Sequence, residues 1–250
     1  MLGAGPAYTD RPGSAGACYL VRSGDSRILL DLGQGAFPRI FPEVHPEALD
    51  AIIVSHLHPD HFIDLVPLRH YLRWEFRPAR RMRVLGPAAL GSRLDALHGE
   101  PGFAGATLDL EPLADGSTVH AGGLRIEARL VTHTEESYGF RVSAGDGPGL
   151  VYSGDCGRAE DLLRLLRPGD ALLTEVAFGP GPAQPAAMHL DGPMVGQVAA
   201  MGRAGRVLLT HLMMAHDPDE TEASVRRAYA GPVEFVWPGS RIVLGDLPAG

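Results

Sequence analysis

The chain has 250 residues, of which 45% are hydrophobic and 21% charged, a composition typical of globular proteins. Its net charge of −8 argues against broad electrostatic binding to nucleic acid. Two cysteines cannot form a disulfide framework or a four-thiolate zinc site, which fits a reducing compartment. We expect a cytoplasmic protein with one domain over residues 1–250 and no membrane partner, because the sequence shows no signal-peptide pattern and no membrane-spanning apolar run.

Short apolar runs predict strands along the chain, and runs with helical apolar spacing predict helices between them. The predicted strands cover residues 17–22, 27–32, 51–55, 82–85, 124–132, 138–143, 149–153, 170–174, 206–210 and 233–236. The predicted helices cover residues 61–74, 87–98, 159–167, 191–203 and 219–230. This order favours an α/β (α+β) fold in which helices cover the outer faces of two sheets.

The stretch SHLHPDH, residues 55–61, places three histidines and an aspartate within six positions. It lies at the end of a predicted strand and at the start of a predicted helix, where a rigid scaffold commonly holds functional side chains. His56 and His58 share one face of this segment, whereas Asp60 and His61 begin another. The pattern therefore indicates ligands for two adjacent metal ions rather than for one.

Three later residues continue this pattern, because each is a His or Asp that directly follows an apolar strand. His133 follows the strand that ends at Thr132, Asp155 follows the run Val151–Gly154, and His211 follows the last apolar run. One such residue would mean little. Three of them after a dense His/Asp cluster predict a shared site.

The motif H-x-H-x-D-H, with the later His, Asp and His, resembles the signature of the metallo-β-lactamase-fold hydrolases over nearly the whole chain. The resemblance implies a four-layer αββα sandwich with two metal ions at one edge. It implies that the first ion is bound by His56, His58 and His133. It implies that the second is bound by Asp60, His61 and His211, and that Asp155 bridges both. Asp60 is also expected to take part in catalysis.

Asp31 in the turn Asp31–Gly33 matches an early D-x-G turn of this family, whose Asp supports a metal ligand through a hydrogen bond. A plain turn at the end of a strand is the alternative. Only Met1 and Leu2 precede Gly3, where family members usually have a full strand, so we expect a truncated first strand. Imidazole and carboxylate donors suit two Zn²⁺ ions, with manganese or iron as alternatives. Ions about 3.5–4 Å apart can hold a bridging hydroxide as the nucleophile.

Residues between Asp155 and His211 indicate the type of hydrolase. His189 precedes a predicted helix and resembles the extra histidine of the phosphodiesterase branch, which includes tRNA 3′-processing endonucleases. Its implied role is to protonate the leaving oxygen or to stabilise the transition state, and Glu175 would orient it. A residue next to a helix N-cap is the alternative for His189. The alternative functions are a tRNA 3′-processing endonuclease, or a lactone or thioester hydrolase on the same metal site.

Only 21 residues lie between His133 and Asp155, which leaves no room for the tRNA-binding arm that bacterial tRNA-processing enzymes carry there. We therefore expect a small phosphodiester substrate, such as a cyclic nucleotide, rather than an extended nucleic acid. The best basic run, Arg73 to Arg83, is interpreted as a solvated loop, with contact to a phosphate as the alternative. Relatives of this branch often form dimers, so a homodimer is expected from the resemblance alone.

Overall fold

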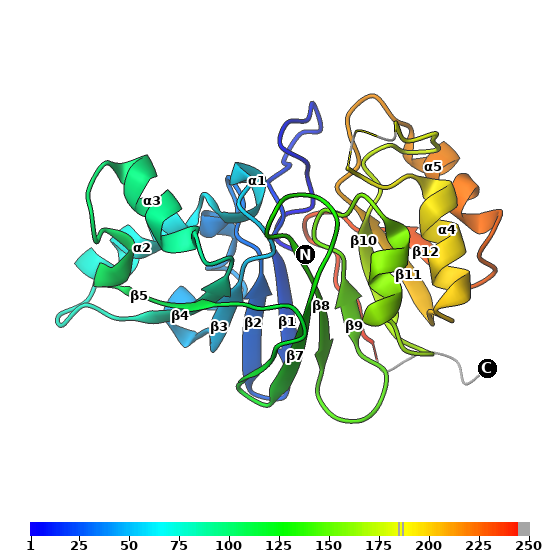
Figure 1. Ribbon diagram of the computed structural model, residues 1–250. Helices are drawn as coiled ribbons and strands as arrows, with labels where there is room; N and C mark the ends of the chain where they lie inside the picture. The colour runs from blue at the N-terminus through cyan, green and yellow to red at the C-terminus, as the bar shows by residue number, and fades with distance from the viewer. Residues whose placement is uncertain (185, 187, 245–250) are drawn as a thin grey trace.

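The structure of the protein is a computed structural model that describes residues 1–184, 186 and 188–244. Two sheets pack face to face, and helices cover their outer faces (Figure 1). The first sheet has the order β1-β2-β3-β4-β5. Its strands are β1 Tyr19–Ser23, β2 Ser26–Leu30, β3 Ala51–Ile53, β4 Met82–Gly86 and β5 Leu108–Pro112.

The second sheet has the order β12-β11-β10-β9-β8-β7-β6, so its strands follow the chain from one edge to the other. Its strands are β6 Thr118–Ala121, β7 Leu124–Leu130, β8 Tyr138–Ser143, β9 Leu150–Tyr152, β10 Ala171–Glu175, β11 Arg206–Thr210 and β12 Val233–Phe235. Strands β9 to β12 are parallel, so their carboxyl ends lie at one edge of the sheet.

Helices lie on the outer face of each sheet. The α-helices are α1 Pro59–Phe62, α2 Leu65–Trp74, α3 Leu90–His98, α4 Gly192–Met201 and α5 Pro218–Arg226. The 3₁₀ helices are η1 Phe37–Arg39, η2 Pro46–Ala48, η3 Ala104–Ala106 and η4 Ala159–Arg164. In the described part of the chain, no helix has the length and the apolar character that crossing a membrane requires.

Three buried apolar clusters separate these four layers. The central cluster lies between the sheets and includes Ile28, Phe140 and Leu173. A second cluster joins the first sheet to α2 and α3, and a third joins the second sheet to η4, α4 and α5. Burial of these side chains supplies the main favourable term in folding. The predicted αββα sandwich is confirmed.

The predicted helix 61–74 is wrong as one element, because the chain forms α1 and α2 with a break between them. Pro67 lies in the first turn of α2 and has no N–H to donate to the carbonyl of Ile63, so the helix restarts here. The predicted helix 159–167 is the shorter 3₁₀ helix η4, since Pro168 and Gly169 follow it closely. The sequence analysis did not predict β5 and β6.

Candidate metal centre

The seven predicted ligands come from the ends of strands in both sheets. His56 and His58 lie in the loop after β3, and Asp60 and His61 lie in the first turn of α1. Pro59 occupies the first position of α1, where its fixed φ favours helix initiation. The other three follow strands of the second sheet, as His133 after β7, Asp155 after β9 and His211 after β11. The structure brings all seven side chains to one edge of the sandwich.

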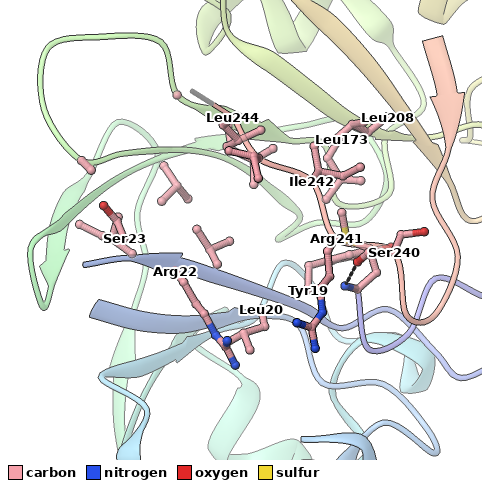
Figure 2. A pocket seen from close by; sticks show the side chains of 18 of the residues that line it. Tyr19, Leu20, Arg22, Ser23, Leu173, Leu208, Ser240, Arg241, Ile242 and Leu244 are labelled. Carbon is pink, nitrogen blue, oxygen red and sulfur yellow. Dashed lines mark hydrogen bonds between the residues drawn. The ribbon is translucent and has the colours of Figure 1, made fainter. Parts of the chain in front are cut away.

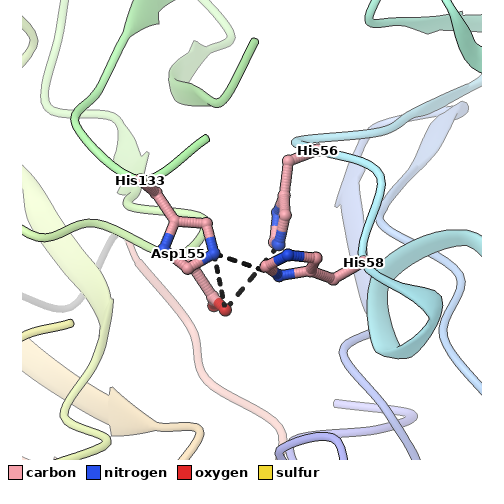
Figure 3. Close-up of side chains that lie close together, drawn as sticks. All are labelled: His56, His58, His133 and Asp155. Carbon is pink, nitrogen blue, oxygen red and sulfur yellow. Dashed lines mark hydrogen bonds and ion pairs between the residues drawn. The ribbon is translucent and has the colours of Figure 1, made fainter. Parts of the chain in front are cut away.

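The first ligand cluster consists of His56, His58, His133 and Asp155, each with one donor atom within 4.8 Å of the others. Figure 3 shows these side chains pointing toward one another from the two sheets. The Nε2 atom of His133 lies 3.1 Å from Nδ1 of His58 and 3.7 Å from Oδ2 of Asp155. Nε2 of His56 is also 3.7 Å from this Asp155 oxygen. The cluster matches the predicted ligand set of the first ion.

The second ligand cluster consists of Asp60, His61, Asp155 and His211, again within 4.8 Å, and all four side chains are buried. The Nε2 atom of His211 lies 3.1 Å from Oδ2 of Asp60 and 3.4 Å from Nε2 of His61. The other oxygen of Asp155, Oδ1, lies 3.2 Å from Nε2 of His61. Asp155 therefore presents one oxygen to each cluster, as a bridging carboxylate requires.

Asp31 fixes the orientation of His61 through the ring nitrogen that does not face the cluster. Its buried carboxylate accepts hydrogen bonds from Nδ1 of His61 at 2.7 Å and from the hydroxyl of Tyr152 at 2.6 Å. Ser55 donates both its backbone N–H, at 2.6 Å, and its hydroxyl, at 2.8 Å. Because Nδ1–H of His61 donates to Asp31, its Nε2 faces the second cluster and is the nitrogen that would bind a metal once its own proton is lost. Asp31 has a φ of 60°, an uncommon backbone conformation that often occurs at functional sites.

Charges in the centre shift the pKa values of its members. Burial lowers the pKa of His56, and the neighbouring His61 lowers it further. Burial would raise the pKa of Asp155, but His211 and His61 outweigh that effect and hold it well below its usual value. At neutral pH the Asp155 carboxylate is therefore ionised and His56 is neutral, the forms in which both groups bind metals.

The donor atoms fit divalent metal ions. Within the described residues, Nε2 of His56 and Oδ1 of Asp155 are buried and have no hydrogen-bond partner. A buried polar atom without a partner typically costs about 1–3 kcal/mol. A cation in each cluster would satisfy these lone pairs without a proton. The centre can therefore bind metals through imidazole and carboxylate groups.

His189 lies next to both clusters but is held by a different partner. Its Nδ1 donates a hydrogen bond to Oε1 of Glu175 at 2.9 Å and lies 3.8 Å from Oδ2 of Asp155. Glu175 ends β10 and is itself fixed by the backbone N–H of Cys156, at 2.8 Å. Burial lowers the pKa of His189, but the Glu175 carboxylate outweighs this effect and raises the pKa to about 9. His189 is therefore a proton donor at neutral pH.

Some groups of the site were not predicted from the sequence. Tyr152 and Ser55 complete the hydrogen bonds of Asp31. Arg11 donates to the carbonyl oxygens of Leu212, at 2.7 Å, and His216, at 3.2 Å, and so anchors the segment after His211. Ser55 could have been found from its place inside the motif. Arg11 carries no such signal, because its contacts span about 200 positions.

A cavity of about 630 Å³ opens elsewhere in the sandwich (Figure 2). It lies between β1, the second sheet and the segment 239–244, and its lining includes the apolar side chains of Leu173, Leu208 and Ile242. None of the seven candidate ligands lines it. We place the chemistry at the edge that carries the ligands.

Comparison with known proteins agrees with this geometry. The family model described as a beta-lactamase superfamily domain matches residues 26–212. An uncharacterized protein from Mycobacterium leprae is 32% identical over 234 residues, which cover 91% of this chain and 82% of the relative.

Solved structures share the fold. The metallo-β-lactamase fold protein YhfI from Bacillus subtilis superposes with a TM-score of 0.85, at 23% identity and over 95% of each chain. The short form of human tRNase Z superposes with a TM-score of 0.73, at 20% identity and over 97% of each chain. The chain has the metallo-β-lactamase fold and belongs to the β-lactamase superfamily.

Proposed function

We propose that this protein is a hydrolase that uses two divalent metal ions, Zn²⁺ in the cell, to cleave a small phosphodiester such as a cyclic nucleotide. The observation that carries this proposal is the position of the His189 imidazole, which Glu175 holds at 2.9 Å beside both ligand clusters and whose pKa the same carboxylate raises. An alkoxide such as a nucleoside oxygen needs a proton when it leaves a phosphodiester, and a positioned histidine commonly supplies it. The similarity in fold to human tRNase Z supports a phosphoester substrate.

In this proposal, different residues bind the metal ions, orient the ligands and donate the proton. His56, His58 and His133 would hold one ion, Asp60, His61 and His211 the other, and Asp155 both. When bound, such ions supply a water of lowered pKa and positive charge opposite the phosphoryl oxygens. Glu175 orients His189 through Nδ1, which leaves Nε2 to donate its proton to the leaving oxygen. Asp31 keeps His61 in the tautomer that binds metal.

The small size of the substrate is supported by the segment between His133 and Asp155. Residues 138–152 in this segment form the antiparallel pair β8 and β9, and the remaining residues are short connections. No arm projects from this fully described segment, so the segment offers no element that could bind a folded RNA. We therefore place precursor tRNA among the test substrates rather than in the proposal.

A substrate panel tests the proposal. We would measure the turnover of bis-p-nitrophenyl phosphate, 2′,3′- and 3′,5′-cyclic nucleotides, precursor tRNA, a lactone and a thioester, each with Zn²⁺ or Mn²⁺. We expect turnover of the small phosphodiesters. On the cyclic nucleotides, whose leaving oxygen needs a proton, the variant His189→Ala should lose about 10²- to 10⁴-fold in kcat while it keeps both metal ions. Turnover of only the lactone or the thioester, unchanged in His189→Ala, would contradict the proposal.

A further inference from the structure

The loop before α4 contacts the site through two adjacent residues. The backbone carbonyl of Met188 accepts a hydrogen bond of 2.7 Å from Nδ1 of the metal-ligand candidate His133. The next residue, His189, is bonded to Glu175. Met188 has a φ of 54°, an uncommon conformation for a residue with a side chain, although 42% of its surface is exposed to solvent. The backbone at Met188 therefore adopts this conformation for a reason other than packing of its side chain.

Gly157 allows this loop to approach His133. A Cβ atom at position 157 would lie 2.7 Å from Cα of Met188 and 3.1 Å from the carbonyl oxygen of Thr132, the residue before His133. The N–H of Gly157 also donates a hydrogen bond to this Thr132 oxygen. Residue 157 thus lies between two backbone segments with no space for a side chain.

The Met188 carbonyl determines which nitrogen of His133 faces the first cluster. A carbonyl oxygen can only accept, so the hydrogen is on Nδ1 and the lone pair is on Nε2. This Nε2 lies 3.1 Å from Nδ1 of His58 and 3.7 Å from Asp155, inside the cluster. A histidine oriented by such a bond is a better metal ligand, since its ring needs no reorientation.

We propose that Gly157 and Met188 are positioning residues that couple the first metal subsite to His189. A metal ion on Nε2 of His133 would strengthen the Nδ1–H bond to the Met188 carbonyl, and this bond holds the following residue, His189, at the site. Coupling of this kind is reciprocal, so displacement of the Met188 carbonyl should also lower the affinity of the first subsite for its metal ion. The effect on catalysis rests on the function proposed for His189, whereas the effect on metal affinity does not.

Two pairs of variants test the metal half of this inference. Gly157→Ala inserts a methyl group against Met188, and its control is Gly105→Ala, where an added Cβ meets no atom within 4 Å. Met188→Val places a β-branched residue at a positive φ, which forces the carbonyl away, whereas Met188→Gly keeps both φ and the carbonyl. Competition of the purified protein with a chromophoric chelator would give the Zn²⁺ affinity of each subsite.

We expect Gly157→Ala and Met188→Val to weaken one of the two Zn²⁺ sites by about 10- to 100-fold. Gly105→Ala and Met188→Gly should stay within about twofold of the unchanged protein. If Gly157→Ala does not fold, the two Met188 variants decide the question, because 42% of the surface of Met188 is exposed and its replacement leaves the core intact. Equal Zn²⁺ affinity in Met188→Val and Met188→Gly would overturn the inference.

The catalytic half is tested by comparing leaving groups. A p-nitrophenolate leaves without a proton, whereas an alkoxide such as a nucleoside oxygen needs one. Saturating Zn²⁺ would remove the effect of affinity, and under it Gly157→Ala and Met188→Val should lose more kcat on the alkyl ester than on the p-nitrophenyl ester. Equal losses on both esters would contradict the coupling to His189. Absence of any phosphodiester turnover in the unchanged protein would instead reject the proposed function and leave the metal result standing.

Discussion

At the scale of single residues, the carboxylate that favours the charged form of His189 is Glu175, which belongs to neither of the two ligand clusters. The pKa of about 9 means that His189 is protonated at neutral pH and loses its proton as the pH rises through that value. Since the proposed function requires the protonated form as the donor to the leaving oxygen, kcat should fall on the alkaline side. Cations in the neighbouring clusters repel this charge, so the fall should begin at or below about pH 9.

The variant Glu175→Gln tests this interpretation of His189. Removal of the carboxylate leaves burial as the main effect on the imidazole, and burial lowers its pKa. We expect the alkaline limb of the kcat profile to move to lower pH by about one unit or more. The profile should be recorded with a substrate whose leaving group needs a proton. An unchanged alkaline limb would show that another group donates the proton.

The metal-ligand candidates could be predicted from the sequence because each follows an apolar strand, and strand ends of one sheet edge meet in space. His133 and His211 are such cases, and the structure places both beside the motif of residues 55–61. The hydroxyl of Tyr152 and the carbonyl of Met188 could not be predicted in this way. Tyr152 donates its hydrogen bond to Asp31, which is 121 positions away in the sequence. Met188 contributes only its backbone carbonyl, and because every residue has one, the residue type gives no signal.

At the scale of elements, α4 and α5 begin in the same way, with an aspartate N-cap followed by a proline within the first turn. The side chain of Asp191 accepts from the N–H of Met194 at 2.9 Å, and Asp217 accepts from Glu220 at 3.0 Å. Asp191 has an additional role, because it also accepts from the N–H of Ala183 at 2.8 Å. It therefore ties the start of α4 to the loop that carries His189.

The two caps form a matched pair for mutation. Asp191→Ala and Asp217→Ala should each lower the free energy of unfolding by about 1 kcal/mol, as loss of an N-cap usually does. Only Asp191→Ala should also lower kcat, by about tenfold or more, because a small displacement of a catalytic group is costly. Chemical denaturation and steady-state kinetics would measure the two effects. A similar fall of kcat in both variants would indicate a general loss of stability instead.

The strands in the middle of each sheet were predictable from their apolar runs, whereas β5 and β6 were not. These two strands lie at the edges of their sheets, and most of their residues are at least partly exposed. An edge strand pairs on one side only and tolerates charged residues and proline, such as Pro112 at the end of β5. Its sequence therefore lacks the continuous apolar run of a central strand.

At the scale of the whole molecule, the candidate metal centre joins the two sheets. His56 and His61 belong to the first sheet and its helices, whereas His133 and His211 follow strands of the second. A ligand that binds only the folded state stabilises it, by about 4 kcal/mol at a thousand times its Kd. Metal ions in this centre should therefore hold the two halves of the sandwich together.

Removal of metal should lower the stability of the entire molecule. We expect a chelator to reduce the Tm by about 10 °C, since 1 kcal/mol corresponds to about 2–4 °C in a chain of this size. The variant Asp155→Ala, which lacks the carboxylate shared by both clusters, should begin with the lower Tm and respond little to the chelator. Differential scanning calorimetry would measure these changes. An unchanged Tm after confirmed metal removal would contradict the prediction.

The order of the ligands along the chain also has a consequence for biosynthesis. The nascent polypeptide presents residues 56–61 early, but the first cluster lacks His133 and Asp155 until the ribosome has passed the middle of the sequence. The second cluster stays incomplete until His211 is added. We therefore expect that any cation acquired during translation is held first by the earlier cluster, whose residues have all been synthesised before those of the second.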